Sequence, residues 1–159
     1  MIPTRSNAIA VIKKYEFPEN AKEYKFTILW ASRHDPLSAQ LDYLYRRFGA
    51  IRVIQIAKFF NNAEEVLSYA LRFDAKIIVA VLPLSIISKL LDLVADTGIR
   101  VLYSEMEKIY EGKEKPKSID EDSEVLIVAK DEEGNTLYKV MRFKKFHYIR
   151  AIRMELEPL

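Results

Sequence analysis

Arg33 and His34 are the adjacent pair of residues in this sequence best suited to chemistry on an anion, and they directly follow an apolar run at residues 24–32. A guanidinium binds phosphate or carboxylate oxygens through paired hydrogen bonds. An imidazole can exchange protons near neutral pH without a perturbed pKa. A phosphodiester reaction needs charge neutralisation, proton transfer and in-line positioning. We therefore predict His34 and Arg33 as catalytic residues, with His34 moving the proton and Arg33 neutralising charge.

Other polar side chains also follow apolar runs, and they complete the predicted site. In an open parallel sheet, ligands bind outside the carboxyl ends of the strands, where the strand order reverses. Helices that begin at this edge direct their N-termini toward an anion. The predicted ligand-binding residues are Ser32, Lys58, Asn61, Ser85 and Ser104.

Several of these residues have an ordinary structural explanation as well. Arg33 and His34 can be loop residues that face solvent, and Lys58 can be a charge at the rim of the sheet. Asp35 is better explained as a helix N-cap, followed by Pro36 at the first helical position, than as a catalytic acid.

The composition excludes several classes of site. The 159 residues include 0 Cys, 2 His and 4 Gly. Disulfides, cysteine zinc sites and thiol nucleophiles are therefore excluded, and so is a metal site with several histidines. The glycine motifs that cradle phosphates, GxGxxG and GxxxxGK[ST], do not occur. We expect no metal and no cofactor, and an RNA substrate would supply its own 2′-hydroxyl as the nucleophile.

The elements that must position these residues follow from the apolar pattern. Short runs rich in β-forming residues predict strands at 24–32, 51–57, 76–82 and 100–104. Helical spacing predicts helices between them, the first ending at Gly49 and the second capped by Asn61 or Asn62. This alternation predicts an α/β fold: a Rossmann-like parallel sheet of order 2-1-3-4, with helices on both faces.

The flanking segments predict a small antiparallel β attachment built from the termini. We expect an N-terminal strand or arm at 1–23, the α/β core at 24–110, a charged linker at 111–123 and a β-hairpin region at 124–159. Residues 105–110 are expected to form a helical tail on the fourth strand. Residues 147–159 are expected to form a further strand with Tyr148, Ile152, Met154 and Leu156 on one face, and residues 8–17 a strand beside these.

The C-terminal basic segment offers an alternative function. Residues 137–153 contain Lys, Arg and aromatic side chains but no acidic residue. Interleaved cations and rings are typical of surfaces that bind single-stranded nucleic acid. Lys144, Lys145 and Arg150 are the predicted contacts of such a nucleic-acid-binding or interaction module. The ordinary explanation is a solvated strand face above buried aromatics.

Charge, composition and hydropathy indicate the kind of partner, source and cellular location to expect. The net charge of +2 and pI near 8.6 do not by themselves indicate a nucleic-acid partner. Absent Cys and scarce Asn and Gln are typical of thermophile proteins, and this composition is of an archaeal type. The sequence has no apolar run of membrane-spanning length and no signal-peptide pattern, so we expect a cytoplasmic protein with no membrane contact.

The two loops also resemble those of a family of small CRISPR-associated proteins related in function to the ring nucleases. In that family a first strand runs into Ser-Arg-His and a later apolar strand ends in Leu-Pro, as Ser32-Arg33-His34 and Leu82-Pro83 do here. The resemblance implies a cyclic oligoadenylate bound near Ser32, Arg33 and His34, and a homodimer, because such a ligand is two-fold symmetric. The leading hypothesis is a protein that binds a nucleotide or small oligonucleotide. If it is an enzyme, it would also cleave this ligand. A structural or assembly protein is the third alternative.

Overall fold

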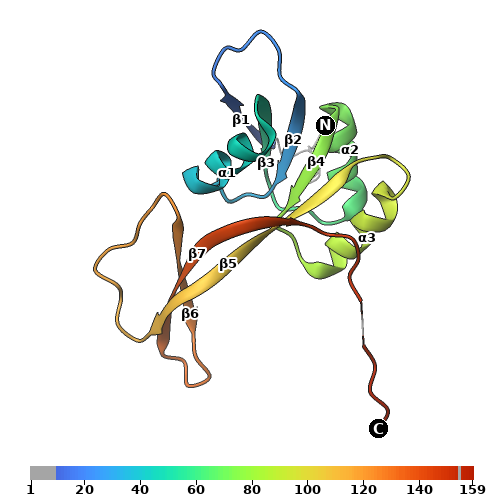
Figure 1. The fold of residues 1–159 in the computed structure, drawn as a ribbon. Helices are drawn as coiled ribbons and strands as arrows, with labels where there is room; N and C mark the ends of the chain where they lie inside the picture. The colour runs from blue at the N-terminus through green and yellow to red at the C-terminus, as the bar shows by residue number, and fades with distance from the viewer. Residues whose placement is uncertain (1–9, 154) are drawn as a thin grey trace, which may run out of the picture. The chain divides into compact units, whose positions relative to one another are not determined.

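The computed structural model describes residues 10–153 and 155–159. Within them the chain forms seven strands and three helices (Figure 1). In chain order these are β1 (Val11–Phe17), β2 (Phe26–Ala31), α1 (Ser38–Phe48), β3 (Ile51–Ala57), α2 (Ala63–Arg72), β4 (Ala75–Ala80), α3 (Leu84–Val94), β5 (Arg100–Gly112), β6 (Glu124–Lys130) and β7 (Thr136–Tyr148).

All seven strands belong to one mixed sheet of order β1-β3-β2-β4-β5-β7-β6. The strands β3, β2, β4 and β5 are parallel neighbours, in the order expected from the sequence. β1 pairs antiparallel with β3, and β6 pairs antiparallel with β7. The parallel strands are apolar because both of their faces are buried, as Ile28 and Leu29 on β2 illustrate.

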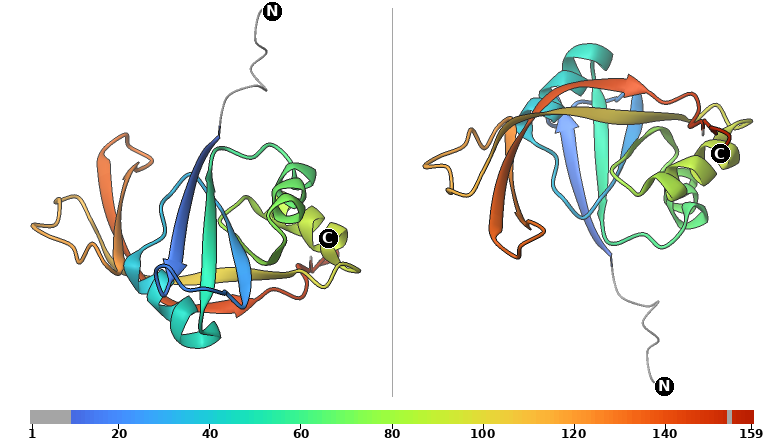
Figure 2. Two further views of the ribbon diagram at one scale, coloured as in Figure 1. Left: turned by 90° about the horizontal axis from the view of Figure 1, so that it is seen from above. Right: turned by 90° about the horizontal axis from the view of Figure 1, so that it is seen from below.

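The predicted fold class is wrong. A Rossmann-like domain is a parallel sheet with helices on both faces, whereas the described chain has more residues in strands than in helices and its sheet is mixed. Two of its three short helices, α2 and α3, lie side by side and pack on the same face (Figure 2). The reason is that the chain adds antiparallel strands to the parallel ones instead of adding further strand–helix units.

The expectations for the flanking segments also need correction. Residues 105–110 are not a helical tail, because β5 continues as a strand to Gly112. The predicted last strand is absent from residues 149–153, since β7 ends at Tyr148; Met154 lies outside the described residues. The N-terminal strand pairs with β3 and not with the C-terminal strands, and residues 8 and 9 are outside the described part. The predicted hairpin of β6 and β7 is confirmed.

Helices α2 and α3 cover one face of the sheet, and the loops that enter these two helices carry residues of the pocket described below. Leu29, Ile54 and Ile78 from three neighbouring strands pack in one cluster with Val66 and Leu90 of these helices. Helix α2 is capped by Asn62, whose side-chain oxygen accepts a hydrogen bond from the Glu65 backbone N–H at 2.8 Å. This packing fixes the loops that leave β3 and β4.

Helix α1 does not begin as expected, and Asp35 is not its cap. Its N-cap residue is Leu37, whose backbone N–H donates to Gln40 Oε1 at 2.7 Å. The Ala39 N–H donates to the carbonyl of Asp122 at 2.9 Å. The helix ends at Gly49, with φ of 82°, as predicted.

The chain divides into two compact units. The first comprises the described residues up to Asp35, Ala50–Tyr103 and the residues from Tyr148 onward; the second comprises Pro36–Gly49 and Ser104–His147. Helices in the described part of the chain lack the length and apolar character needed to cross a bilayer.

Candidate functional site

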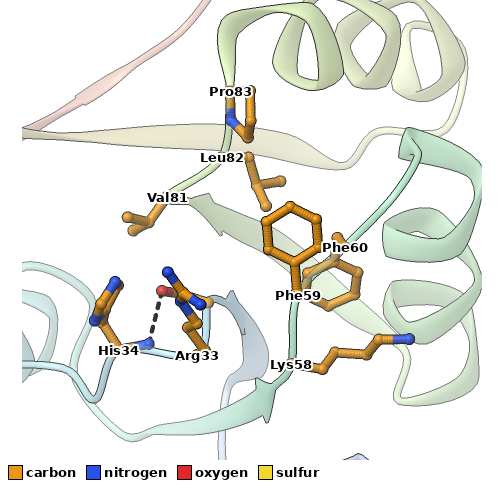
Figure 3. A pocket seen from close by; sticks show the side chains of 9 residues that line it. Arg33, His34, Lys58, Phe59, Phe60, Val81, Leu82 and Pro83 are labelled. Atoms are coloured by element: carbon orange, nitrogen blue, oxygen red, sulfur yellow. Dashed lines mark hydrogen bonds between the residues drawn. The ribbon is translucent and has the colours of Figure 1, made fainter. Parts of the chain in front are cut away.

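A pocket of about 310 Å³ lies in the first unit, where β2, β3 and β4 end. It joins a polar side to an apolar one (Figure 3). Its lining residues are Ser32, Arg33, His34, Lys58, Phe59, Phe60, Val81, Leu82 and Pro83. Four of the residues predicted for the site are therefore brought together, because neighbouring parallel strands end at the same edge of a sheet.

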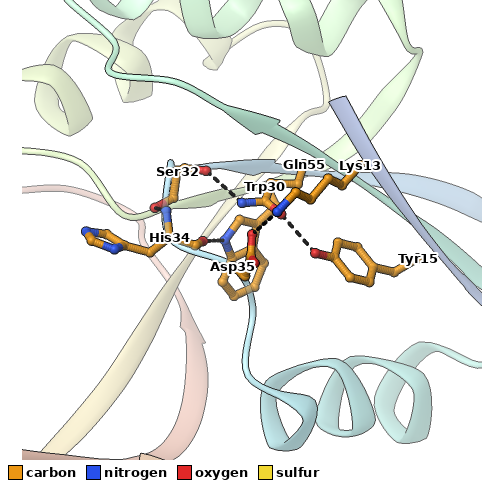
Figure 4. A network of polar contacts seen from close by, with 7 residues as sticks. All are labelled: Lys13, Tyr15, Trp30, Ser32, His34, Asp35 and Gln55. Atoms are coloured by element: carbon orange, nitrogen blue, oxygen red, sulfur yellow. Dashed lines mark hydrogen bonds and ion pairs between the residues drawn. The ribbon is translucent and has the colours of Figure 1, made fainter. Parts of the chain in front are cut away.

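The loop that carries Arg33 and His34 is held by three hydrogen bonds. The Trp30 indole N–H donates to the carbonyl of His34 at 3.1 Å, and the His34 backbone N–H donates to Ser32 Oγ at 3.0 Å (Figure 4). The Gln55 side-chain amide donates to the carbonyl of Ser32 at 3.1 Å. Ser32 thus acts on the loop backbone, where its hydroxyl fixes the turn.

Gln55 links this loop to the edge strand β1. It is fully buried on β3, and its amide oxygen accepts a hydrogen bond from the Tyr15 hydroxyl at 2.9 Å. Lys13 on β1 also reaches the loop, with Nζ 2.8 Å from Asp35 Oδ1. The hydrogen bond from Lys13 lowers the pKa of Asp35, so this carboxylate is ionised and already paired with Lys13. Asp35 therefore braces the loop and is not placed to act as an acid.

The side chains of Arg33 and His34 remain available. Both are exposed, and neither forms an ion pair with any described carboxylate. The Arg33 guanidinium lies over the Phe59 ring, 6.0 Å from its centroid. Within the described part of the chain, no hydrogen bond engages the His34 imidazole. A rigid backbone thus presents a guanidinium and an imidazole that an incoming anion can contact.

Lys58 lines the pocket but directs its ammonium elsewhere. Its Nζ forms an ion pair with Glu65 and lies 5.7 Å from the centroid of the Phe60 ring. In Figure 3 the Lys58 side chain extends away from Arg33 and His34. The ligand-binding role predicted for Lys58 would require it to leave Glu65.

The three remaining residues predicted for the site do not line the pocket. Asn61 is exposed in the loop before α2, and Ser85 is exposed in the first turn of α3. Ser104 belongs to the second unit, where its hydroxyl accepts a hydrogen bond from Gln40 Nε2 at 3.0 Å.

On the apolar side of the pocket, the sequence-based prediction omitted Phe59 and Val81, whereas Leu82 and Pro83 belong to a loop that it placed at the site. Phe59 is 65% exposed although its neighbour Phe60 is 2% exposed. Val81 is 44% exposed, and Leu82 and Pro83 continue the apolar side. The signal for Phe59 was available: two successive aromatics at a strand end cannot both face the core when side chains alternate.

The C-terminal basic segment is partly neutralised within the second unit. Lys144 Nζ lies 3.6 Å from Glu105, and His147 Nε2 lies 3.1 Å from the same carboxylate. The contact with His147 lowers the pKa of Glu105, which keeps this acid ionised beside the basic strand. Lys145 and Arg150 are exposed and form no ion pair with the described residues.

The pocket combines one guanidinium, one imidazole and an exposed aromatic ring, a set that suits a planar ligand with a phosphate. Among the described residues no group of three or more His, Asp or Glu side chains could hold a metal ion. Comparisons with family models, with curated proteins and with solved structures found no match.

Proposed function

We propose that this protein binds a nucleotide or short oligonucleotide in the pocket at the ends of β2, β3 and β4. The observation that carries the proposal is the exposed Arg33 guanidinium, 6.0 Å from the centroid of the exposed Phe59 ring, with the His34 imidazole lining the same pocket. The cationic side would contact a phosphate and the Phe59 ring would stack on a base. The volume of about 310 Å³ lies at the small end of ligand pockets, which suits one nucleotide unit.

The chemical class of ligand is an adenylate in this proposal. The resemblance of Ser32-Arg33-His34 and Leu82-Pro83 to a CRISPR-associated family favours an oligoadenylate, cyclic or linear. An aromatic face accepts any base, so the base preference must come from hydrogen bonds within the complex. We expect the protein to act in the cytoplasm, where such nucleotides are available.

Cleavage is the second hypothesis, and the unengaged His34 imidazole on a fixed backbone favours it. In an oligoribonucleotide the 2′-oxygen would attack the adjacent phosphorus, forming a 2′-O–P bond as the P–O5′ bond breaks. His34 would accept the 2′-hydroxyl proton, and water would protonate the leaving 5′-oxygen. The products are a 2′,3′-cyclic phosphate and a 5′-hydroxyl.

A titration with AMP, linear oligoadenylates and cyclic oligoadenylates tests the proposal. Calorimetry measures binding and chromatography measures products. We expect Arg33→Gln and Phe59→Ala each to weaken binding about tenfold or more, which corresponds to about 1.4 kcal/mol. Lys89→Gln is the matched control, because this exposed lysine on α3 does not line the pocket.

The His34→Ala variant separates binding from cleavage. A protein that only binds the nucleotide releases no product in the wild type, so this variant can change only its affinity. An enzyme loses product formation in the variant by about a hundredfold or more. Absence of binding to the wild type, or equal affinity in an Arg33→Gln/Phe59→Ala double variant, contradicts the proposed function.

A further inference from the structure

The strand β6 ends the sheet and exposes apolar side chains. β7 is its only neighbour among the described strands. Val125 is 38% exposed, Ile127 43% and Val128 61%, and no charged residue occurs between Glu124 and Lys130. An edge strand that lacks a central charge, a proline or a bulge is a template for pairing with another strand.

The backbone of β6 has a defined set of outward-facing groups. The Ser123 carbonyl accepts from the Phe143 N–H, and the Asp131 N–H donates to the Asn135 carbonyl, so odd-numbered residues bond toward β7. The β6–β7 register is regular from Glu124 to Lys130. Because backbone direction alternates along a strand, the N–H and C=O groups of Leu126 and Val128 face away from β7.

The sequence of β6 is complementary to itself in the antiparallel direction. A two-fold axis through Ile127 sets Leu126 opposite the partner subunit's Val128, and these are the residues whose backbone groups face outward. The same axis sets Val125 opposite the partner subunit's Ala129, so apolar residues meet along the middle of the strand, while the Glu124 carboxylate is held by Arg142 and the Asp120 N–H of its own chain. Ile127 meets its own copy in a pair without backbone hydrogen bonds, where side chains approach most closely.

We propose that β6 is a dimer interface at which two copies of this chain pair edge to edge, antiparallel, about an axis through Ile127. The interface closes on itself, since a two-fold contact uses the same surface of both subunits. This inference is independent of the proposed nucleotide site.

The other edge of the sheet supports this assignment by contrast. β1 is the opposite edge strand, and it carries Lys13 and Lys14 in its interior. Lysines within an edge strand oppose pairing with another chain. Lys13 is also bound to Asp35. Of the two edges, β6 is therefore the one built to receive a second copy.

Amide hydrogen exchange of the wild-type protein, followed residue by residue with NMR at low and high concentration, tests the interface without a variant. We expect a concentration-dependent dimer by ultracentrifugation. On dimerisation the Leu126 and Val128 amides should slow about tenfold or more, because their exchange then requires opening of the interface. The Ile127 amide bonds toward β7 and should be protected at both concentrations.

Two variants test the register. Val128→Pro removes an outward N–H but no β6–β7 hydrogen bond, so it should give a folded monomer. Ile127→Lys sets two ammonium groups opposite each other on the axis and should raise the dimer Kd about fivefold. Leu71→Lys makes the same charge change at an exposed apolar position on α2 and should leave the Kd unchanged. A monomer at every concentration, an open-ended assembly, or a dimer whose Leu126 and Val128 amides still exchange rapidly overturns the proposal.

Discussion

Replacement of Gln55 by Leu tests how the loop of the candidate site is held. Gln55 is fully buried and bridges the Tyr15 hydroxyl to the carbonyl of Ser32, a residue that is itself 3% exposed. Leucine has a similar volume, so the substitution removes hydrogen bonds without opening a large cavity. The Ser32 carbonyl then loses the donor on which it depends.

The expected loss follows from this geometry. A buried acceptor left without its donor costs about 1–3 kcal/mol. The Tyr15 hydroxyl, on a half-buried side chain, can turn toward water and adds little. We therefore expect Gln55→Leu to lower the free energy of unfolding by about 1–3 kcal/mol, measured by urea denaturation with far-UV circular dichroism.

A double-mutant cycle supplies the control. Tyr15→Phe alone removes one partly exposed hydrogen bond and should cost about 0.5–1.5 kcal/mol. Added to Gln55→Leu, the same change should cost close to nothing, because its partner is already absent. A Gln55→Leu variant within about 0.5 kcal/mol of the wild type would refute this account of the loop.

Three further predictions concern individual contacts. Asn62→Ala should cost about 1 kcal/mol in urea denaturation because the cap of α2 is lost, and Asn61→Ala should cost almost nothing. Lys58→Met should change nucleotide affinity by less than about threefold in calorimetry, well under 1.4 kcal/mol, since Lys58 pairs with Glu65; a tenfold loss contradicts this. The backbone N–H of Asp120, and then Arg142, lower the pKa of Glu124, so this contact stabilises the fold above the unfolded pKa of about 4.3. Thermal melts against pH should show that this stabilisation is lost as the pH falls through the folded pKa, and that Glu124→Gln is less stable than wild type at pH 7 but has a flatter acid limb.

The parallel strands were predictable because burial on both faces leaves an unbroken apolar run. Such runs placed β2, β3 and β4 within a residue or two of their observed bounds. Their order followed from the right-handed crossover rule, and with it the meeting of Ser32, Arg33, His34 and Lys58 at one pocket. Local sequence signals were enough to predict the end of α1 at Gly49 and the hairpin between β6 and β7.

The second half of β5 was not predictable from its own sequence. Read alone, its charges indicate a helical tail at 105–110 and then a solvated linker, yet Glu105 and Glu111 face basic residues of β7 across the sheet. Charge complementarity between strands becomes visible only when the pairing is known. The predicted fold class was wrong for this reason. Because the pairing of β5 with β7 was missed, we expected an α/β domain where the chain forms one mixed sheet.

The predicted start of α1 was wrong for a related reason. Asp35 has the residue type of an N-cap, but Lys13 holds its carboxylate. The groups that satisfy the helix start, Gln40 and the distant Asp122, give no local capping signal. Gln55 was missed likewise, because an amide inside an apolar strand gives no sign of the loop it will hold.

The most direct test of the nucleotide site is an NMR titration with a linear oligoadenylate that follows side-chain and backbone signals together. We predict saturable shifts of the Arg33 guanidinium, the His34 imidazole and the Phe59 ring, with Lys145 and Arg150 unchanged. Shifts confined to Lys145 and Arg150, and weakened by salt, would contradict the pocket and support the basic segment instead.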